Sequence, residues 1–332
     1  MKEKSIVELN WIRALAAVGV ILYHYTTRYP ELFSSNIVFG YQFSWGRAGV
    51  NTFFLLSGFL SLYNLNEHIT GVAYIRKRVK KLYPEYWICM ALTAITELLF
   101  LKAFFPGGAA LAVNMTMLQG FLGIKNVDGA YWTLAYELRF YALIFFLMFI
   151  KKICAIKWVS IAWVLLSLLY SSMDFNGSLW YLGKIFDFIC MPEFCAPFSA
   201  GIFLFYLFKE YKDRSGWIGL ICSLLLSFRV QDDSYFIALC MTIFAILLIK
   251  FIREHSEQYQ RLLDKIQKWP VRPLSLIAEI SYPLYLLHQY IGYAILQKAE
   301  LFGAKSEWVI ILPIFIISVL AVMIHRFVWR KK

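Results

Sequence analysis

The stretch Asn10-Trp-Ile-Arg-Ala-Leu-Ala-Ala-Val-Gly-Val-Ile-Leu-Tyr-His24 belongs to an apolar run near residues 7–27 that contains two ionisable side chains. A helix needs about 20 apolar residues to span a membrane, so the run is long enough. It follows a charged N-terminal start, as the apolar part of a signal peptide does. However, Arg13 and His24 interrupt it and no small-residue cleavage site follows cleanly. The stretch therefore predicts a retained membrane span.

The composition extends this prediction to the whole chain. Of the 332 residues, 60% are hydrophobic and 16% are charged, and the mean hydropathy is +0.61. An ordinary soluble domain has about 25% charged residues. These values exclude disorder, fibrous repeats and most soluble folds. We expect an all-α, polytopic integral membrane protein with about ten transmembrane helices. The apolar runs lie near 7–27, 48–65, 85–105, 132–150, 156–173, 194–208, 216–230, 234–252, 274–297 and 308–328.

The positive charges predict the orientation. Under ten spans, 23 Lys and Arg side chains fall on one side of the membrane and eight on the other. Because cytoplasmic loops are rich in Lys and Arg, we predict that both termini are cytoplasmic. This bias also accounts for the net charge of +12, so we do not expect nucleic acid as a partner.

Little of the chain remains outside the spans. We therefore expect residues 1–332 to form a single transmembrane domain with no extra soluble domain. Residues 253–269 alternate charged and apolar side chains, which predicts either an amphipathic helix at the membrane surface or a solvated connector. The six Cys are scattered with no CxxC pair, so we expect free buried thiols and no metal site.

Ionisable residues inside spans are candidate functional residues. Arg13 and His24 are eleven residues apart, so a helix places them on one face, separated by about 16 Å along its axis. Glu137, in the span that starts at Trp132, lies about 8 Å below the outer boundary, a depth comparable to that of His24. An imidazole and a carboxylate at one depth suit general acid–base chemistry. Alternatively, Arg13 reaches the lipid headgroups, His24 is interfacial and Glu137 pairs structurally with Arg139.

Two further spans carry polar patterns. The segment Ser281-Tyr-Pro-Leu-Tyr-Leu-Leu-His288 runs outward, so His288 falls in the outer half of the membrane, with Tyr285 on the same face. His288 is either a functional residue or a hydrogen-bonded interior histidine. In the second span, Gly58 is predicted to permit the close approach of a neighbouring helix.

A basic segment precedes the third span. It reads Arg76-Lys-Arg-Val-Lys-Lys-Leu-Tyr-Pro84, and Pro84 suits the first turn of a helix. The cluster is suited to binding the phosphates of a soluble donor or an anionic lipid. The alternative is that these residues supply only the positive charge typical of a cytoplasmic loop.

Together, these segments resemble the acyltransferase-3 family of integral-membrane, bacterial surface-polymer O-acyltransferases. The family's basic residue and His, with ten residues between them, match Arg13 and His24. Its Phe-Phe-x-x-Ser-Gly-Phe, Trp-Ser/Thr-Leu-x-x-Glu and Ser-Tyr-x-x-Tyr-Leu-x-His patterns match 53–59, 132–137 and 281–288. The resemblance covers nearly the whole chain, and the four motifs occur in the right order.

The resemblance implies a multi-pass O-acyltransferase of the bacterial cytoplasmic membrane with no bound cofactor. The donor would be cytoplasmic acyl-coenzyme A, most often acetyl-coenzyme A. The acceptor would be a sugar hydroxyl of a surface polysaccharide or lipid-linked oligosaccharide. The predicted roles are catalysis for His24, Glu137 and Arg13, donor binding for Arg78, Lys81 and Arg76, and acceptor or oxyanion contacts for Ser57, Trp132, Tyr285 and His288.

The chain departs from the family pattern at three positions. Asn10 and Asn51 stand where the family often has Asp, and Lys81 stands where it has Arg. Lys keeps the positive charge but loses the bidentate geometry with which Arg binds phosphate.

A transporter or flippase is the alternative function. Intramembrane Arg, His and Glu side chains would then form a binding site or a proton relay for a lipid-linked sugar or an ion.

Overall fold

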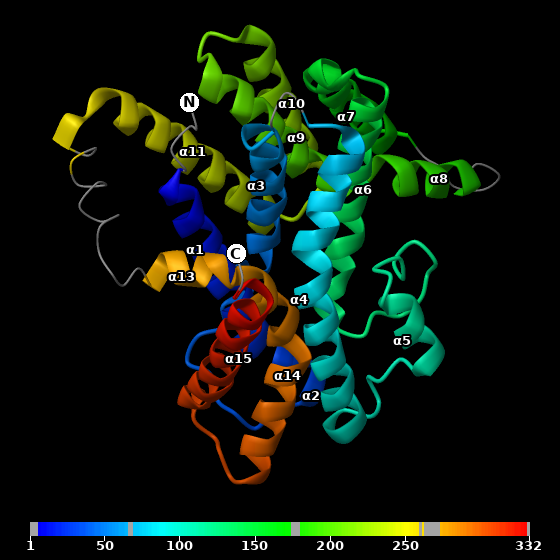
Figure 1. The fold of residues 1–332 in the computed structure, drawn as a ribbon. Helices are drawn as coiled ribbons and strands as arrows, with labels where there is room; N and C mark the ends of the chain where they lie inside the picture. Colours follow the sequence, from blue (N-terminus) through cyan, green and yellow to red (C-terminus); the bar gives the residue numbers. More distant parts are fainter. Residues whose placement is uncertain (1–5, 66–68, 174–179, 259–260, 262–272, 331–332) are drawn as a thin grey trace. The chain divides into compact units, whose positions relative to one another are not determined.

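The structure is a computed structural model that describes residues 6–65, 69–173, 180–258, 261 and 273–330 (Figure 1). Each of the ten predicted apolar runs coincides with helix, so the all-α prediction is confirmed for this part of the chain. The helices are α1 (Val7–Tyr23), α2 (Tyr29–Phe33), α3 (Gly49–Tyr63), α4 (Gly71–Phe100), α5 (Gly108–Asn114), α6 (Trp132–Phe149), α7 (Ile156–Ser171), α8 (Trp180–Cys190), α9 (Pro192–Lys209), α10 (Arg214–Val230), α11 (Asp233–His255), α13 (Pro273–Glu279), α14 (Ser281–Leu301) and α15 (Ile311–Trp329).

Within the described residues, five helical segments have the length and hydropathy of a membrane span. They are Gly129–Phe149, Ile153–Ser171, Tyr181–Lys209, Asp233–His255 and Glu307–Trp329. Large apolar side chains on these segments, such as Phe244 and Phe315, are exposed and suited to contact with lipid. These features are those of a membrane protein. The count of ten spans and the cytoplasmic location of both termini remain predictions.

Some local expectations are wrong. The basic loop predicted over 66–84 is helical from Gly71, so Pro84 lies inside α4 and not in a first turn. Arg and Lys are good helix formers, and membrane helices tolerate Pro where neighbouring groups satisfy the freed backbone. The span predicted over 274–297 divides at Ile280 into α13 and α14.

Other differences concern the loops and the thiols. Helices α5 and α8 lie in segments where no helix was expected. Cys154 is exposed, although a buried thiol was predicted there. Most of the helix or connector predicted over 253–269 lies outside the described residues.

The chain forms two compact units, each built from three separate segments. Unit 1 comprises residues 1–13, 48–73 and 140–273, and unit 2 comprises 14–47, 74–139 and 274–332. Several helices, α1 and α6 among them, pass from one unit into the other. Whether the whole chain acts as a single domain remains a prediction.

Helix α9 is the centre of unit 1, where it packs against α3, α7 and α10. At the crossing of α3 and α9, a Cβ atom on Gly58 would lie 2.2 Å from the carbonyl oxygen of Phe198. A Cβ atom on Gly201 would lie 2.0 Å from the carbonyl oxygen of Leu55. Both distances are far below van der Waals contact, so the two backbones approach this closely only because both positions are glycine. The close approach predicted at Gly58 is confirmed.

A pair of side-chain amides, from the buried Asn51 and the half-buried Gln231, connects α3 with the turn between α10 and α11. The Asn51 side chain donates to Gln231 Oε1 (2.8 Å) and to the carbonyl oxygen of Tyr235 (3.1 Å), and it accepts from Gln231 Nε2 (3.2 Å). An amide both donates and accepts, whereas an ionised carboxylate only accepts. At position 51 the acyltransferase-3 pattern often has Asp. Asn51 suits its partner Gln231, because each amide donates one hydrogen bond to the other and accepts one in return.

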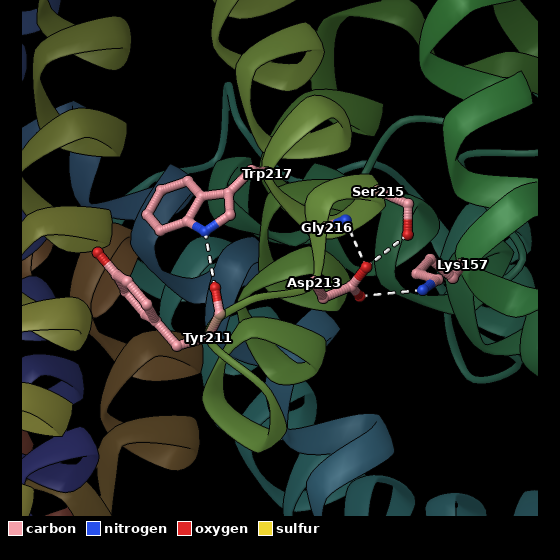
Figure 2. Close-up of polar contacts among 6 residues, drawn as sticks. All are labelled: Lys157, Tyr211, Asp213, Ser215, Gly216 and Trp217. Atoms are coloured by element: carbon pink, nitrogen blue, oxygen red, sulfur yellow. Dashed lines mark hydrogen bonds and ion pairs between the residues drawn. The ribbon is translucent and has the colours of Figure 1, made fainter.

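The turn between α9 and α10 is fastened by a single carboxylate (Figure 2). Asp213 precedes α10 and accepts from Ser215 Oγ (2.6 Å), Gly216 N (3.2 Å) and Lys157 Nζ of α7 (2.9 Å). Burial acts to raise the pKa of Asp213, but these hydrogen bonds outweigh it and hold the pKa below its ordinary value. The carboxylate thus caps α10 and ties it to α7.

In unit 2, α14 packs against α15 (Figure 1). The segment before α3 crosses α1 at two glycines, since a Cβ atom on Gly46 would lie 2.0 Å from the carbonyl oxygen of Gly19. Five residues beyond Gly19, the helix changes into a π-helical turn, His24–Arg28 (η1). The backbone N–H of Phe43 donates to Thr26 Oγ1 (2.9 Å), which fixes the crossing segment beside η1.

Candidate active site

His24 begins the π-helical turn η1, immediately after the last residue of α1. Single π-helical turns inside α-helices are rare and occur frequently at functional sites. His24 Nδ1 lies 2.8 Å from the Tyr293 hydroxyl of α14. The His24 ring also meets the His288 ring edge-on, with the ring centroids 4.7 Å apart and the planes at 74°. Two histidines from opposite ends of the sequence therefore lie in direct contact.

The hydrogen bonds of His288 determine which of its nitrogens carries the proton. His288 Nδ1 is 2.5 Å from the carbonyl oxygen of Tyr285, which can only accept, so Nδ1–H is the donor. In the neutral imidazole, Nε2 then has a lone pair. Among the described residues, Nε2 has no hydrogen-bond partner, although His288 is fully buried. His288 is therefore arranged as a proton acceptor.

Tyr25 fixes the backbone of this histidine. Its hydroxyl donates to the carbonyl oxygen of His288 (2.7 Å), and its ring lies against α14 at Gly292. A Cβ atom on Gly292 would lie 2.1 Å from the Tyr25 hydroxyl oxygen. Because Tyr25 directly follows His24, this single contact holds both histidines in place.

The other predicted residues near α14 have mixed outcomes. The Tyr285 hydroxyl donates to the carbonyl oxygen of Ala130 (2.9 Å) and lies 3.0 Å from Thr133 Oγ1. These bonds connect α14 to the start of α6 near His288. A contact between Tyr285 and an acceptor remains a prediction. Trp132 packs edge-on against Tyr136, with ring centroids 5.6 Å apart.

Glu137 lies on α6, within electrostatic range of Tyr282. Tyr282 is six residues before His288 on α14. The guanidinium of Arg139 stacks on the rings of Phe121 (5.0 Å) and Tyr136 (5.2 Å). The role of Glu137 as the partner of His24 remains a prediction, as does the alternative pairing with Arg139.

Arg13 and Ser57 belong to unit 1, whereas the two histidines belong to unit 2. Arg13 is on α1, eleven residues before His24, and Ser57 is on α3. Their predicted catalytic and acceptor roles remain predictions.

The predicted donor-binding residues lie on α4. Arg76 and Lys81 are exposed, and the Arg78 guanidinium stacks on the Tyr74 ring at 5.1 Å. Because these residues are helical and not in a loop, Arg78 and Lys81 share a face at a spacing of three residues.

The next carboxylate along α4 was not predicted as a site residue. Glu85 is almost fully buried and interacts with His325 Nδ1 (2.7 Å), while Trp329 Nε1 donates to the same oxygen (2.8 Å). This pair of contacts holds α15 against the end of the basic segment.

Four other residues of the site were also missed. Tyr25 and Tyr293 gave no signal, because Tyr is common in this chain, with 21 residues. Asp128 lay in a predicted outer loop. Glu97 could have been found, because it is ionisable and lies in a predicted span. It is fully buried, and in the described part of the chain neither of its oxygens has a hydrogen-bond donor.

Comparisons with known proteins place the chain in a family. A family model described as an acyltransferase domain matches residues 6–326. O-acetyltransferase OatA of Staphylococcus aureus (strain NCTC 8325) is 25% identical over 96% of this chain and 56% of its own length. Peptidoglycan O-acetyltransferase OatA of Listeria monocytogenes is 24% identical over 98% of this chain and 55% of its own length. The chain thus spans a little over half the length of these relatives. No solved structure matches the chain significantly. The family match over nearly the whole chain shows that this protein belongs to the acyltransferase-3 family of membrane acyltransferases.

Proposed function

We propose that this protein is a membrane-bound O-acetyltransferase that uses the His24–His288 pair as its catalytic base. The donor is acyl-coenzyme A, in the first place acetyl-coenzyme A, and the acceptor is a sugar hydroxyl of a cell-surface glycan. The observation that carries the proposal is the contact between the two imidazoles, one of which has an Nε2 without a hydrogen-bond partner among the described residues. The family membership supports the reaction class.

The base removes a proton from the acceptor hydroxyl. His288 Nε2 takes the proton while the acceptor oxygen attacks the thioester carbonyl carbon. The carbon–sulfur bond then breaks, the ester remains on the sugar, and the imidazolium returns the proton to the departing thiolate. No oxidant or reductant is required, because atoms and charge balance within donor and acceptor.

His24 acts with His288 in this scheme. It lies against the His288 ring and shares a hydrogen bond with the Tyr293 hydroxyl, which fixes its orientation. A catalytic role for His24 is what the resemblance to the family motif implies. Replacing either histidine therefore tests the same step. Glu137 is proposed to stabilise the charge that develops there, and the catalytic role of Arg13 remains a prediction.

The donor is proposed to bind at the basic end of α4. Arg78, Lys81 and Arg76 would hold its phosphates, and Glu85 would keep the helix in place through α15. Changing both Arg78 and Lys81 to Ala should raise the KM for acetyl-coenzyme A and leave kcat near its original value. The matched control is Lys80→Ala, because Lys80 is exposed on another face. An equal effect of Lys80→Ala would show that only bulk positive charge matters.

The acceptor class follows from the relatives. The Listeria relative is named as a peptidoglycan O-acetyltransferase, so peptidoglycan glycan strands are the first acceptor to test. Other surface polysaccharides and lipid-linked oligosaccharides belong to the same chemical class. Trp132 and Tyr285 are the proposed acceptor contacts, and an acceptor contact by Ser57 remains a prediction.

The reaction requires a fixed orientation in the bacterial cytoplasmic membrane. The charge bias places both termini of a ten-span protein in the cytoplasm. A reporter fused after Lys332 should therefore be cytoplasmic, and a tag in the loop 106–131 should be accessible from outside. An opposite location for either tag would refute the ten-span topology.

The decisive experiment uses the purified full-length protein with radiolabelled acetyl-coenzyme A and soluble peptidoglycan fragments. The unmodified protein should transfer label to the glycan. His24→Ala and His288→Ala should each reduce transfer by roughly 100- to 10,000-fold, the usual effect of losing a positioned base. His255→Ala is the matched control, because His255 is exposed on α11. Transfer at the original rate by both site variants would refute the assignment.

The same experiment separates the enzyme from a transporter. A transporter would leave the donor thioester intact while a labelled lipid-linked sugar crossed the membrane of proteoliposomes. That result would overturn the proposed reaction.

A further inference from the structure

The turn Gly129–Tyr131 (η3) is hydrogen-bonded to the residues of α14 that precede His288. The Tyr131 hydroxyl donates to the carbonyl oxygen of Leu286 (3.2 Å), and the Tyr285 hydroxyl donates to the carbonyl oxygen of Ala130 (2.9 Å). Ala130, Tyr131 and Leu286 are buried and Tyr285 is half-buried. The turn and the histidine therefore form one packed assembly within unit 2.

Asp128 supplies the contact beyond His288. Its carboxylate accepts from Ala130 N (2.8 Å) and from Tyr290 N (3.1 Å), and the side chain is fully buried. In an α-helix the N–H of Tyr290 points toward the carbonyl oxygen of Leu286. His288 lies between Leu286 and Tyr290 in the chain. The 128–131 segment thus contacts both the Leu286 carbonyl oxygen and the Tyr290 N–H, the two groups of that helical hydrogen bond.

The setting of Asp128 makes its charge sensitive to pH. Burial raises the pKa of Asp128 to about 7, although the N–H groups of Ala130 and Tyr290 act in the opposite direction. Near neutral pH the group therefore exists both as the carboxylate and as the acid. The titratable side chains within electrostatic range of Asp128 are Glu97 and Tyr86 on α4, Tyr25 on η1, Tyr131 on η3, and Tyr290 and Tyr293 on α14.

We propose that Asp128 is a positioning residue for the reaction, whose ionised carboxylate holds the Tyr290 N–H and thereby sets the orientation of His288. Asp128 does not touch the reacting atoms. It acts through the backbone of α14, and the inference rests on the proposed role of the His24–His288 pair. Loss of the carboxylate should therefore reduce kcat and leave the KM for the donor unchanged.

The charge state predicts a pH dependence. As the pH falls through about 7, Asp128 becomes protonated and one of its oxygens turns from an acceptor into a donor. The bond to Tyr290 N weakens, and the turn of α14 that carries His288 loosens. Activity should fall with it.

The test measures transfer from radiolabelled acetyl-coenzyme A to peptidoglycan fragments by the purified full-length protein. Asp128→Asn keeps the size of the side chain but presents only one accepting oxygen. It should lower kcat roughly 10- to 100-fold, as a displacement of about 1 Å does at an active site, with the donor KM within about threefold. In the unmodified protein, kcat should fall as the pH decreases through about 7. In Asp128→Asn this decrease near pH 7 should be absent. The matched control is Lys125→Ala, an exposed residue of the same segment, which should behave as the unmodified protein.

A second measurement does not depend on catalysis. Hydrogen–deuterium exchange at the Tyr290 amide, corrected for the intrinsic effect of pH, should be faster at pH 6 than at pH 8 in the unmodified protein. In Asp128→Asn it should be fast at both pH values. This readout remains valid if the variant is less stable, because the unmodified protein is measured alone.

The two hypotheses fail in different ways. If the histidine variants abolish transfer while Asp128→Asn keeps its kcat and pH profile, Asp128 has no positioning role and the proposed function stands. If the unmodified protein transfers no acetyl group, the proposed function fails. The role of Asp128 is then tested by hydrogen–deuterium exchange alone. Equal exchange rates of the Tyr290 amide at pH 6 and pH 8 would overturn the inference.

Discussion

Gly292→Ala should damage the active site through a single methyl group. The new Cβ atom would lie 2.1 Å from the Tyr25 hydroxyl oxygen and 2.5 Å from its Cε1 and Cζ atoms. Ordinary contact begins at about 3.4 Å, so the Tyr25 ring must withdraw by about 1 Å. Its hydrogen bond to the His288 carbonyl, now 2.7 Å, would lengthen to about 3.7 Å and be lost.

The magnitude follows from two effects. Overpacking a close-packed interior costs about 1–3 kcal/mol, and leaving a buried hydrogen-bonding pair unsatisfied costs about 1–3 kcal/mol more. The free energy of unfolding should therefore fall by about 2–6 kcal/mol. Because Tyr25 is bonded to His288 and adjoins His24, acetyl transfer should fall by about 100-fold in the protein that remains folded.

The assay is thermal unfolding of the detergent-purified protein, followed by acetyl transfer below the unfolding temperature. The matched control is Gly108→Ala, since a Cβ atom on Gly108 would have nothing within 4 Å. Tyr25→Phe separates the two effects, because it removes the hydrogen bond without adding a methyl group. If Gly292→Ala unfolded and reacted like Gly108→Ala, the close contact between Tyr25 and α14 would be refuted.

Three further predictions concern unit 1 and are measured by thermal unfolding. Gly201→Ala should destabilise the protein by about 1–3 kcal/mol or more, because its Cβ atom would lie 2.0 Å from the Leu55 carbonyl oxygen; an unchanged midpoint would contradict the close crossing of α3 and α9. Asn51→Asp should cost about 1–3 kcal/mol, because a carboxylate cannot donate the two hydrogen bonds that the buried amide makes; full stability at neutral pH would refute this account. The depressed pKa of Asp213 contributes stability above the pKa of the unfolded chain, and this contribution is lost as the pH falls through the folded pKa. Lys157→Met should therefore reduce stability more at pH 7 than at pH 3, and equal effects at the two pH values would contradict the ion pair.

Much of the architecture could be predicted because local patterns specify it. Apolar runs of the right length predicted helices in all ten places, since an unpaired backbone cannot be buried in lipid. Gly58 was correctly predicted as a point of close helix approach. The start of α4 was missed because Arg and Lys favour helix as readily as they favour a solvated loop, and Pro84 marked a false boundary.

The candidate site was only partly predictable. His24 and His288 could be singled out because ionisable residues are costly inside spans. Their contact could not, because they are 264 residues apart and helical periodicity carries no information about which faces meet. Glu137 was selected for its depth. Asp128 was not selected, because it falls in a predicted outer loop, although its carboxylate accepts from the Tyr290 N–H of α14.

Composition and the spacing of residues along single helices are enough to predict a helical membrane protein and the polar side chains that its helices carry. The three-dimensional fold was needed to show that the two imidazoles meet edge-on, that Tyr25 packs on Gly292 and that the carbonyl oxygen of Tyr285 accepts a hydrogen bond from the proton-bearing nitrogen of His288. The physical reason is that hydrogen-bond direction and van der Waals contact depend on distances between elements that are remote in the chain.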